Sequence, residues 1–587
     1  MQLARADILP EPDLPDGASL LQDGARLAAD WQVGPSEFLK AHGVTSEHAF
    51  KLRCMENGCV TQHAQIGFRD RAKSIRAYHD IWVACAREGI SVDRYGLCLD
   101  WSMAVPRAQR VDAQRGTGMI LPGVEDFVRL ANAAPVAPHF GDFVLGFPAA
   151  LENTQAALAG GSTAIGNLGQ YFTFRIPGFG DDIAATRETV RAIGLIAAQP
   201  VPVIVHSNID DGFGAQFTDL ASCLGMMLLE KDLIERLAGA PVGHCYGHHF
   251  SDPLARRAFH AAMAWAGMSP GTVIYGNTTS YRGSPAQNRS SLASYLLVDA
   301  LGQISQPTGH AINAVPVTEN QRIPDIDEVV DAQLMAGRLK QHAETWQGLV
   351  PLEVTDDLAG RILAGGRHFH RATLRGLADA GIDTDDLFEV LLALRRIGAR
   401  QLEAVFGAGV VDETAPVGRV PHVSAGIVEE ISEMATAALA DLAPETRKTL
   451  SESGLKVLSA AGDVHQHGKM VVDEVLRKLG LTPLDGGVST DPQRLVQMAK
   501  DIAPDVIAIS TYNGVALSYL EQLQTDLAKA NLEIPVLMGG RLNQIADVSN
   551  SSLPHDVSQD LSARGAIICQ SAAELAPALA ALLRQNS

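Results

Sequence analysis

Two imidazoles and a carboxylate lie within five residues of one another in GDVHQHGKMVVDEV, residues 462–475. Asp463, His465 and His467 separate an apolar segment from an amphipathic one, which places them in a loop between a strand and a helix. These residues leave three interpretations open: a solvated turn, a small metal site with nitrogen and oxygen ligands, or a grip on a large cofactor. The surrounding segment offers the lone Cys569 and no second pair of Cys or His at metal spacing, so a small metal site is not favoured.

The segment that contains this loop alternates between apolar strands and amphipathic helices. Asp491 and Pro492 are typical of a helix start. This alternation predicts a doubly wound parallel sheet with helices on both faces, in which ligands bind outside the carboxyl ends of the strands. The loop, STYNG and GGRLN should therefore meet at one edge. Strands are predicted at 454–462, 481–488, 504–511, 534–540 and 565–570, and helices at 469–480 and 491–503 among others.

The spacing Asp-x-His-x-x-Gly after the first strand gives the loop a specific likeness. Asp463, His465 and Gly468 resemble the signature of the cobalamin-binding domain of mutases and methionine synthase. The resemblance implies that His465 ligates cobalt from the lower face and displaces the cofactor's own nucleotide base. It implies that Asp463 hydrogen-bonds the other ring nitrogen and sets its tautomer. Gly468 would leave room for the nucleotide tail, and His467 would lie at the corrin edge or in solvent.

Two further elements of the same domain match in order. Ser510 and Thr511 follow the third strand, where the family has Ser-x-Leu and the hydroxyl meets the buried base. Here Tyr512 replaces the Leu. Gly539 and Gly540 match the Gly-Gly pair beside which the tail passes. The resemblance spans about 135 residues and implies bound cobalamin with its cobalt.

The upstream chain shows about eight strand-and-helix units in about 300 residues, which fits a (β/α)8 TIM barrel with its active site at the carboxyl face. The sequence therefore predicts an α/β fold: an N-terminal arm (1–48), a TIM-barrel substrate domain (49–345), a helical linker region (346–450) and a flavodoxin-like cobalamin-binding domain (451–587). The barrel strands are predicted within 60–68, 95–101, 133–140, 162–169, 200–208, 240–247, 271–277 and 309–317.

Patches of the barrel resemble glutamate mutase. In that family the barrel and the cobalamin-binding domain are usually separate subunits, whereas here they would be fused in one chain. These patches lie at 146–161, 172–190, 242–259 and 308–322. The resemblance implies arginines that clamp a substrate carboxylate. Arg107 stands where one clamp arginine belongs, and Arg175 lies near another such position. The other clamp positions and the ribose contacts around 305–313 are not matched, so the substrate is not expected to be glutamate itself.

Histidines at predicted strand ends are the remaining pocket candidates. His206, His244 and His310 are predicted to contribute to a polar pocket that binds a carboxylate or carbonyl and moves a proton. Further candidates at similar positions are His139, His248, His249 and Tyr275. The alternative for each of these histidines is a buried histidine that only satisfies backbone partners.

Composition and charge exclude several other classes of protein. The formal net charge of −20 with no basic tract argues against nucleic acid. Seven cysteines, an odd number, favour reduced thiols over a disulfide framework. The start of the chain has no apolar signal core, and no apolar run is long enough to span a bilayer. We expect a cytoplasmic protein with a small-molecule substrate, no membrane or nucleic-acid partner, and a homodimeric assembly.

The leading hypothesis is an adenosylcobalamin-dependent radical isomerase, a carbon-skeleton mutase that acts on a small carboxylate or acyl substrate. Adenosylcobalamin is favoured over methylcobalamin because of the resemblance of the barrel. A corrinoid methyltransferase or methyl carrier is the first alternative, and a non-catalytic cobalamin sensor or carrier is the second.

Overall fold

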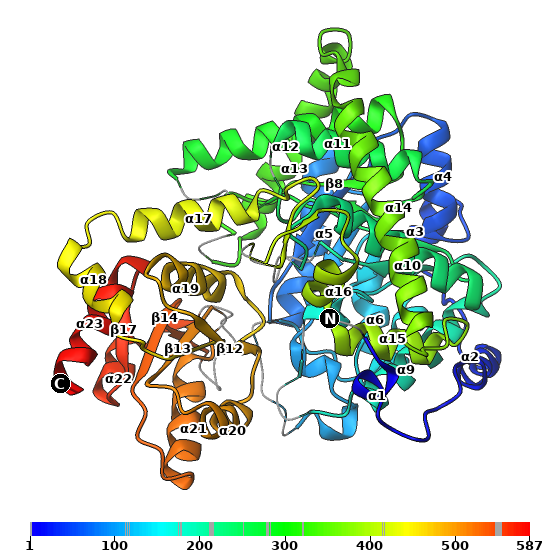
Figure 1. The fold of residues 1–587 in the computed structure, drawn as a ribbon. Coiled ribbons are helices and arrows are strands. Elements are labelled where there is room, and N and C mark those ends of the chain that lie inside the picture. Colours follow the sequence, from blue (N-terminus) through cyan, green and yellow to red (C-terminus); the bar gives the residue numbers. More distant parts are fainter. Residues whose placement is uncertain are drawn as a thin grey trace.

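Two α/β units lie side by side in the computed structural model (Figure 1). The larger, blue to green, carries the first strands of the chain, and the smaller, orange to red, contains the C-terminus. No helix of the described residues is both long and apolar enough to cross a membrane. The structure describes residues 3–586 except 112, 114–115, 117, 174, 177–178, 211–215, 251, 278–280, 282, 320–321, 414, 416, 513 and 546–553.

The larger unit is a nearly closed barrel of eight parallel strands, which confirms the predicted fold class. The sheet runs β6-β5-β4-β3-β2-β1-β8-β7, and a parallel bridge between Tyr246 and Ile274 joins its two ends. Each strand lies within the segment predicted for it, except that β2 begins one residue earlier, at Arg94. The strands are β1 (Gln62–Ile66), β2 (Arg94–Leu97), β3 (Ala137–Phe140), β4 (Ala164–Ile165), β5 (Ile204–Ser207), β6 (Val242–His244), β7 (Val273–Ile274) and β8 (Ala311–Asn313).

An outer ring of helices covers the barrel. Short acidic side chains begin several of them: Asp70, Asp219 and Asp252 each accept a hydrogen bond from a backbone N–H of the first turn. The ring contains α5 (Arg71–Arg87), α6 (Val124–Ala131), α7 (Ala150–Ala159), α9 (Asp182–Ala197), α10 (Leu220–Leu237), α11 (Pro253–Trp265), α12 (Pro285–Ser305) and α13 (Ile326–Trp346). Shorter helices in the loops are η2 (Trp101–Ala104), η3 (Arg107–Gln109) and α8 (Gln170–Thr173).

Side chains of the strands alternate between the barrel interior and the helix layer. His63 and Gln65 of β1 point inward, since a Cβ added at Gly96 of the neighbouring strand would overlap both. Gln62 points outward and donates to the side-chain oxygen of Gln333 on α13 at 2.9 Å. This alternation decides which predicted histidines can face a substrate.

Helical segments flank the barrel on both sides in sequence. Before it stand α1 (Arg5–Ile8), α2 (Gly17–Arg26), η1 (Leu27–Ala29), α3 (Glu37–His42) and α4 (Glu47–Glu56). After it come η5 (Leu352–Thr355), α14 (Asp356–Asp379), α15 (Leu387–Ile397), α16 (Ala399–Phe406), the hairpin β9 (Val410–Val411) and β10 (Arg419–Val420), α17 (Ile427–Ala438) and α18 (Pro444–Glu452). Within the predicted helical linker region, β10 is followed by a bond back to the barrel, from Leu220 N to Val423 O at 2.9 Å.

The smaller unit has a five-stranded parallel sheet in the order β12-β11-β13-β14-β17, which confirms the flavodoxin-like prediction. Its strands are β11 (Val457–Ala461), β12 (Pro483–Val488), β13 (Val506–Thr511), β14 (Val536–Gly540) and β17 (Ile567–Cys569), with the pair β15 (Asn543–Gln544) and β16 (His555–Asp556) beside them. Its helices are α19 (His467–Lys478), α20 (Pro492–Ile502), α21 (Ala516–Lys529), α22 (Ser558–Ala563), η6 (Ala572–Glu574) and α23 (Leu575–Asn586).

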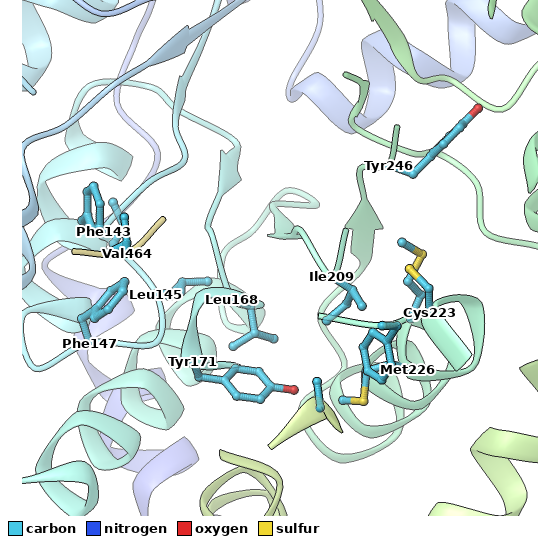
Figure 2. Packing of buried hydrophobic residues seen from close by; sticks show 14 of the residues in the cluster. Phe143, Leu145, Phe147, Leu168, Tyr171, Ile209, Cys223, Met226, Tyr246 and Val464 are labelled. Carbon is cyan, nitrogen blue, oxygen red and sulfur yellow. The ribbon is translucent and has the colours of Figure 1, made fainter. Parts of the chain in front are cut away.

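The two units contact each other at the carboxyl ends of their strands. Val464, in the loop after β11, is buried in the same hydrophobic cluster as Phe143 and Phe147 of the loop after β3 (Figure 2). The Ser489 hydroxyl, beyond β12, donates to the backbone oxygen of Arg175 at 3.1 Å. The edge of the small sheet where the predicted site lies therefore faces the mouth of the barrel.

Candidate functional site

Asp463 and His465 form a hydrogen-bonded pair at the end of β11. The Asp463 carboxylate is 2% exposed. Its Oδ1 accepts from His465 N and from His465 Nδ1, both at 2.9 Å, and its Oδ2 accepts from Tyr512 N at 2.6 Å. Burial alone would raise the pKa of Asp463, but the bonds from His465 and Tyr512 outweigh it and hold the pKa below its usual value. An ionised Asp463 keeps the proton of His465 on Nδ1, which makes Nε2 the nitrogen suited to a metal.

Two glycine positions bring backbone close to the end of β13. A Cβ added at Gly468, in the first turn of α19, would overlap the Ser510 hydroxyl oxygen. Gly540 has a φ of +88°, and a Cβ there would overlap the Thr511 carbonyl oxygen. Gly539 pairs in register with Ser510 along the sheet. The glycines and the hydroxyl groups predicted from the sequence are therefore neighbours at one edge.

This edge fits a cobalamin. The Asp463–His465 pair presents an imidazole whose tautomer is fixed, so that its Nε2 would be the nitrogen able to bind a metal. Gly468 and Gly540 stand where a side chain would collide with Ser510 or Thr511. His467 begins α19 and is half-buried, two residues from the pair. The residues present thus have the donor chemistry and the clearance that the cofactor needs.

His206 lies inside the barrel but below its mouth. Its Nδ1 donates to the Thr272 hydroxyl at 2.9 Å, and its ring meets that of His139 edge-on at 4.4 Å. His206 is the third of the four residues of β5, and its partner Thr272 directly precedes β7, so the bond is directed away from the mouth. Burial, together with nearby Arg94, lowers the pKa of His206 well below its usual value and keeps the ring neutral. The structure places His206 beneath the mouth and not at it.

The structure does not bring His244 and His310 into the barrel interior. His244 Nε2 lies 2.9 Å from the Glu230 carboxylate on α10, and both side chains are fully buried between strand and helix. His310 also lies between the strands and the helices. Its Nδ1 is 2.7 Å from the Thr308 hydroxyl, and its ring centroid is 5.2 Å from that of Tyr246. Alternation along the strands turns both side chains outward, which favours a structural role for each, although among the described residues Nδ1 of His244 and Nε2 of His310 are buried without a hydrogen-bond partner.

The two predicted arginines lie on loops around the barrel. Arg107 is exposed at the start of η3, and its backbone N–H donates to Glu152. The arginine of this loop that turns inward is Arg110, which donates to Glu152 and Asn153. Arg175 is exposed at the contact with the small domain, where its backbone accepts from Ser489. Neither predicted arginine joins the predicted histidines in one pocket.

Other polar groups follow the strand ends at the mouth, and the sequence predicted His248 and Tyr275 among them as pocket candidates, but not Cys98, Asp142 or Glu319. Cys98, directly after β2, accepts from the Gln65 amide at 3.0 Å. Burial raises the pKa of the Cys98 thiol, and the carboxylates of Asp142 and Glu319 raise it further, so both acids lie near it. His248 stacks on Tyr275 with ring centroids 4.0 Å apart. In the sequence, the only sign that these residues belong to the mouth is their position after a predicted strand.

Asp142 and Glu319 are acids of the loops after β3 and β8. Solvent reaches both side chains, yet protein encloses them closely enough that burial raises the pKa of each to about 7. The Gln170 amide donates to Asp142 at 3.2 Å. Two carboxyl groups that change protonation near neutral pH thus stand at the barrel mouth, opposite the small domain.

Comparisons with known proteins agree with this assignment of the small domain. Residues 455–550 match the family model described as the B12 binding domain. Methionine synthase of Mycobacterium tuberculosis (strain ATCC 25618 / H37Rv) is 26% identical over 200 residues, which cover 33% of this chain and 15% of that protein. The chain therefore spans less than a fifth of the length of this curated relative.

Two solved structures were also matched, with low scores. A cobalamin-binding protein from Desulfitobacterium hafniense DCB-2 gives a TM-score of 0.19 at 17% identity over 36% of this chain and 90% of that one. A dihydrodipicolinate synthase from Agrobacterium tumefaciens str. C58 gives 0.26 at 13% identity over 59% and 100%. These scores are too low to relate the architecture to either protein. The family match and the sheet order together identify residues 455–550 as a B12-binding domain, carried by a chain whose larger unit is an eight-stranded α/β barrel.

Proposed function

We propose that the chain is an adenosylcobalamin-dependent isomerase in which the B12-binding domain holds the cofactor against the mouth of the barrel. This proposal rests on one observation: the carboxyl ends of the strands in the small sheet face the carboxyl ends of the barrel strands. Val464 and Phe143 are buried in the same hydrophobic cluster, and the Ser489 hydroxyl donates to the Arg175 backbone oxygen. A reactive cofactor needs such enclosure, because water and oxygen must be kept from the reacting atoms.

In this proposal the chain's own residues hold the cofactor and orient the substrate. His465 supplies the cobalt ligand, Asp463 fixes its tautomer, and Gly468 clears the path of the tail beside Ser510. When bound, adenosylcobalamin supplies a carbon radical that removes a substrate hydrogen.

The substrate would bind among the polar groups of the mouth. Asp142 and Glu319, each with a pKa of about 7, are able to hold or move a proton on a substrate hydroxyl, amine or carboxyl group. The stacked pair His248–Tyr275 gives one wall of the pocket. Burial lowers the pKa of His248 to about 3, so that wall is neutral and favours a polar, uncharged part of the substrate.

Methyl transfer is the second candidate, because the relative matched by sequence is a methionine synthase. In that case the barrel would bind a methyl donor or acceptor, and the cofactor would carry the methyl group between them.

One experiment separates the two. The purified chain is loaded anaerobically with adenosylcobalamin and mixed with small carboxylic acids and acyl thioesters, and electron paramagnetic resonance spectra are recorded after freezing. A cobalt-coupled organic radical signal with any of these substrates supports the isomerase. Absence of that signal, together with methylcobalamin extracted from the natively purified chain, refutes the isomerase and supports methyl transfer.

A further inference from the structure

An aromatic side chain covers one face of the proposed cobalt ligand. Tyr512 stands where the resembling family has leucine. Its ring centroid lies 4.5 Å from that of His465, with the planes inclined by 37°. The backbone N–H of Tyr512 also donates to Asp463 Oδ2, while His465 donates to Oδ1 of the same carboxylate. Both rings are therefore fixed relative to Asp463.

Arg541 covers Tyr512 in turn. Its guanidinium carbon lies 4.7 Å from the centre of the phenol ring, within cation–π range. The backbone of Arg541 is held by two bonds to Thr511: its N–H donates to the Thr511 carbonyl at 2.8 Å, and its carbonyl accepts from the Thr511 hydroxyl at 3.1 Å. The stack of His465, Tyr512 and Arg541 thus uses the ends of β11, β13 and β14.

Two restraints are needed to fix the plane of an imidazole. The hydrogen bond from Nδ1 to Asp463 sets one atom of the ring, but it leaves rotation about that contact possible. Packing of Tyr512 against the ring face removes this freedom. A leucine would fill part of the same space, but it offers neither a flat surface nor a partner for the Arg541 cation.

We propose that Tyr512 is a positioning residue that fixes the ring plane of His465, so that Nε2 is directed at the cobalt of bound cobalamin, and that Arg541 holds Tyr512 in place. The inference rests on the proposed role of His465 as the cobalt ligand, and it concerns binding and not turnover. Tyr512 acts through His465 and contacts no substrate in this role.

The test uses the full chain and cob(II)alamin as the probe. Histidine is labelled with ¹⁵N, and electron paramagnetic resonance measures the hyperfine splitting that a protein nitrogen bound to cobalt produces. Affinity for hydroxocobalamin is measured by absorbance titration. Tyr512→Phe keeps the flat ring and should retain the splitting and the affinity of the natural chain. Tyr512→Ala should broaden or lose the splitting and weaken affinity about 10-fold, with Tyr512→Leu in between.

Controls keep the outcomes distinct. His465→Ala should lose the splitting altogether. If it does not, the ligand assignment fails, and this inference falls with it. If His465→Ala loses the splitting while Tyr512→Ala and Arg541→Gln both match the natural chain, only the positioning role is refuted. Tyr512 is 37% exposed, so its truncation should leave the unfolding midpoint of the cofactor-free chain unchanged. The more conservative Arg541→Gln gives a second measurement if Tyr512→Ala does unfold.

Discussion

Replacement of Asp463 by Asn tests the centre of the cofactor site. Among the described residues, the carboxylate accepts two bonds from His465 at Oδ1 and one from Tyr512 at Oδ2. Asparagine has a single acceptor oxygen. If that oxygen faces His465, the amide NH₂ meets the N–H of Tyr512; if it faces Tyr512, both bonds to His465 are lost. At least one donor therefore loses its partner in either orientation.

The magnitude follows from these bonds. A hydrogen bond to a buried charged group contributes about 1.5–3 kcal/mol, and the bonds that remain become neutral and roughly half as strong. Relief of the burial cost of the carboxylate offsets part of this loss, because burial opposes ionisation at this position. We expect the cofactor-free chain to lose about 2 kcal/mol of unfolding free energy. Cobalamin affinity should fall about 10- to 100-fold, as for other partners of metal-bound histidines.

The assay compares Asp463→Asn with Asp485→Asn in urea denaturation and in hydroxocobalamin titration. Asp485 belongs to the same sheet, but its side chain is 78% exposed, although it pairs with Lys469. Lys469 is itself buried but also pairs with Asp473, so its ammonium keeps an acidic partner in this control, which should leave affinity unchanged. Equal affinities for the two variants would refute the argument that Asp463 orients the ligand.

Three further changes test other parts of the chain. Gly468→Ala should weaken cobalamin binding and destabilise the small domain by about 1–3 kcal/mol in urea denaturation; the double variant with Ser510→Ala should recover much of the stability, because the overlapping oxygen is then absent. Burial raises the pKa of Glu403 to about 7, so the stability from its protonated form is complete below pH 4.5 and is lost as the pH rises through 7. In Glu403→Gln, this decrease in unfolding free energy between pH 5 and 8, at most about 3 kcal/mol, should be absent. A decrease equal to that of the natural chain would contradict the raised pKa of Glu403. Arg256→Met should cost about 3–5 kcal/mol in denaturation, since it leaves Asp299 buried without its cation, and Asp299→Asn in the same chain should restore part of the loss.

The fold was predictable because its pattern is local. Each barrel strand lies inside an apolar segment bounded by turn residues, and helix starts such as Asp252 with Pro253 are visible in the sequence. Boundaries were less accurate: α19 begins at His467, two residues before the expected start. Its first turn has no apolar residue, so the periodic pattern begins only after the helix does.

The barrel pocket was less predictable, for a physical reason. Strands of a parallel barrel are buried on both faces, by the interior on one side and by helices on the other. The sequence therefore lacks the polar alternation that would tell an inward residue from an outward one. His206 points inward and His244 outward, although both are buried histidines near the ends of their strands. Asp142 and Glu319 lie beyond the strands, where only the three-dimensional arrangement brings them near Cys98.

The cofactor site was predictable because the sheet order brings its motifs together. In the order 2-1-3, β11 is hydrogen-bonded directly to β13, and Ala461 pairs with Ser510 in register. A side chain two residues beyond β11 therefore reaches the backbone beyond β13, which is the bond from Tyr512 N to Asp463. Asp463 thus has two roles, since it orients His465 and also connects the loop of this proposed cobalt ligand to the loop of Tyr512. The spacing pattern in the loop after β11 therefore also predicts which residues lie beside it at the end of β13, about 45 residues later in the chain.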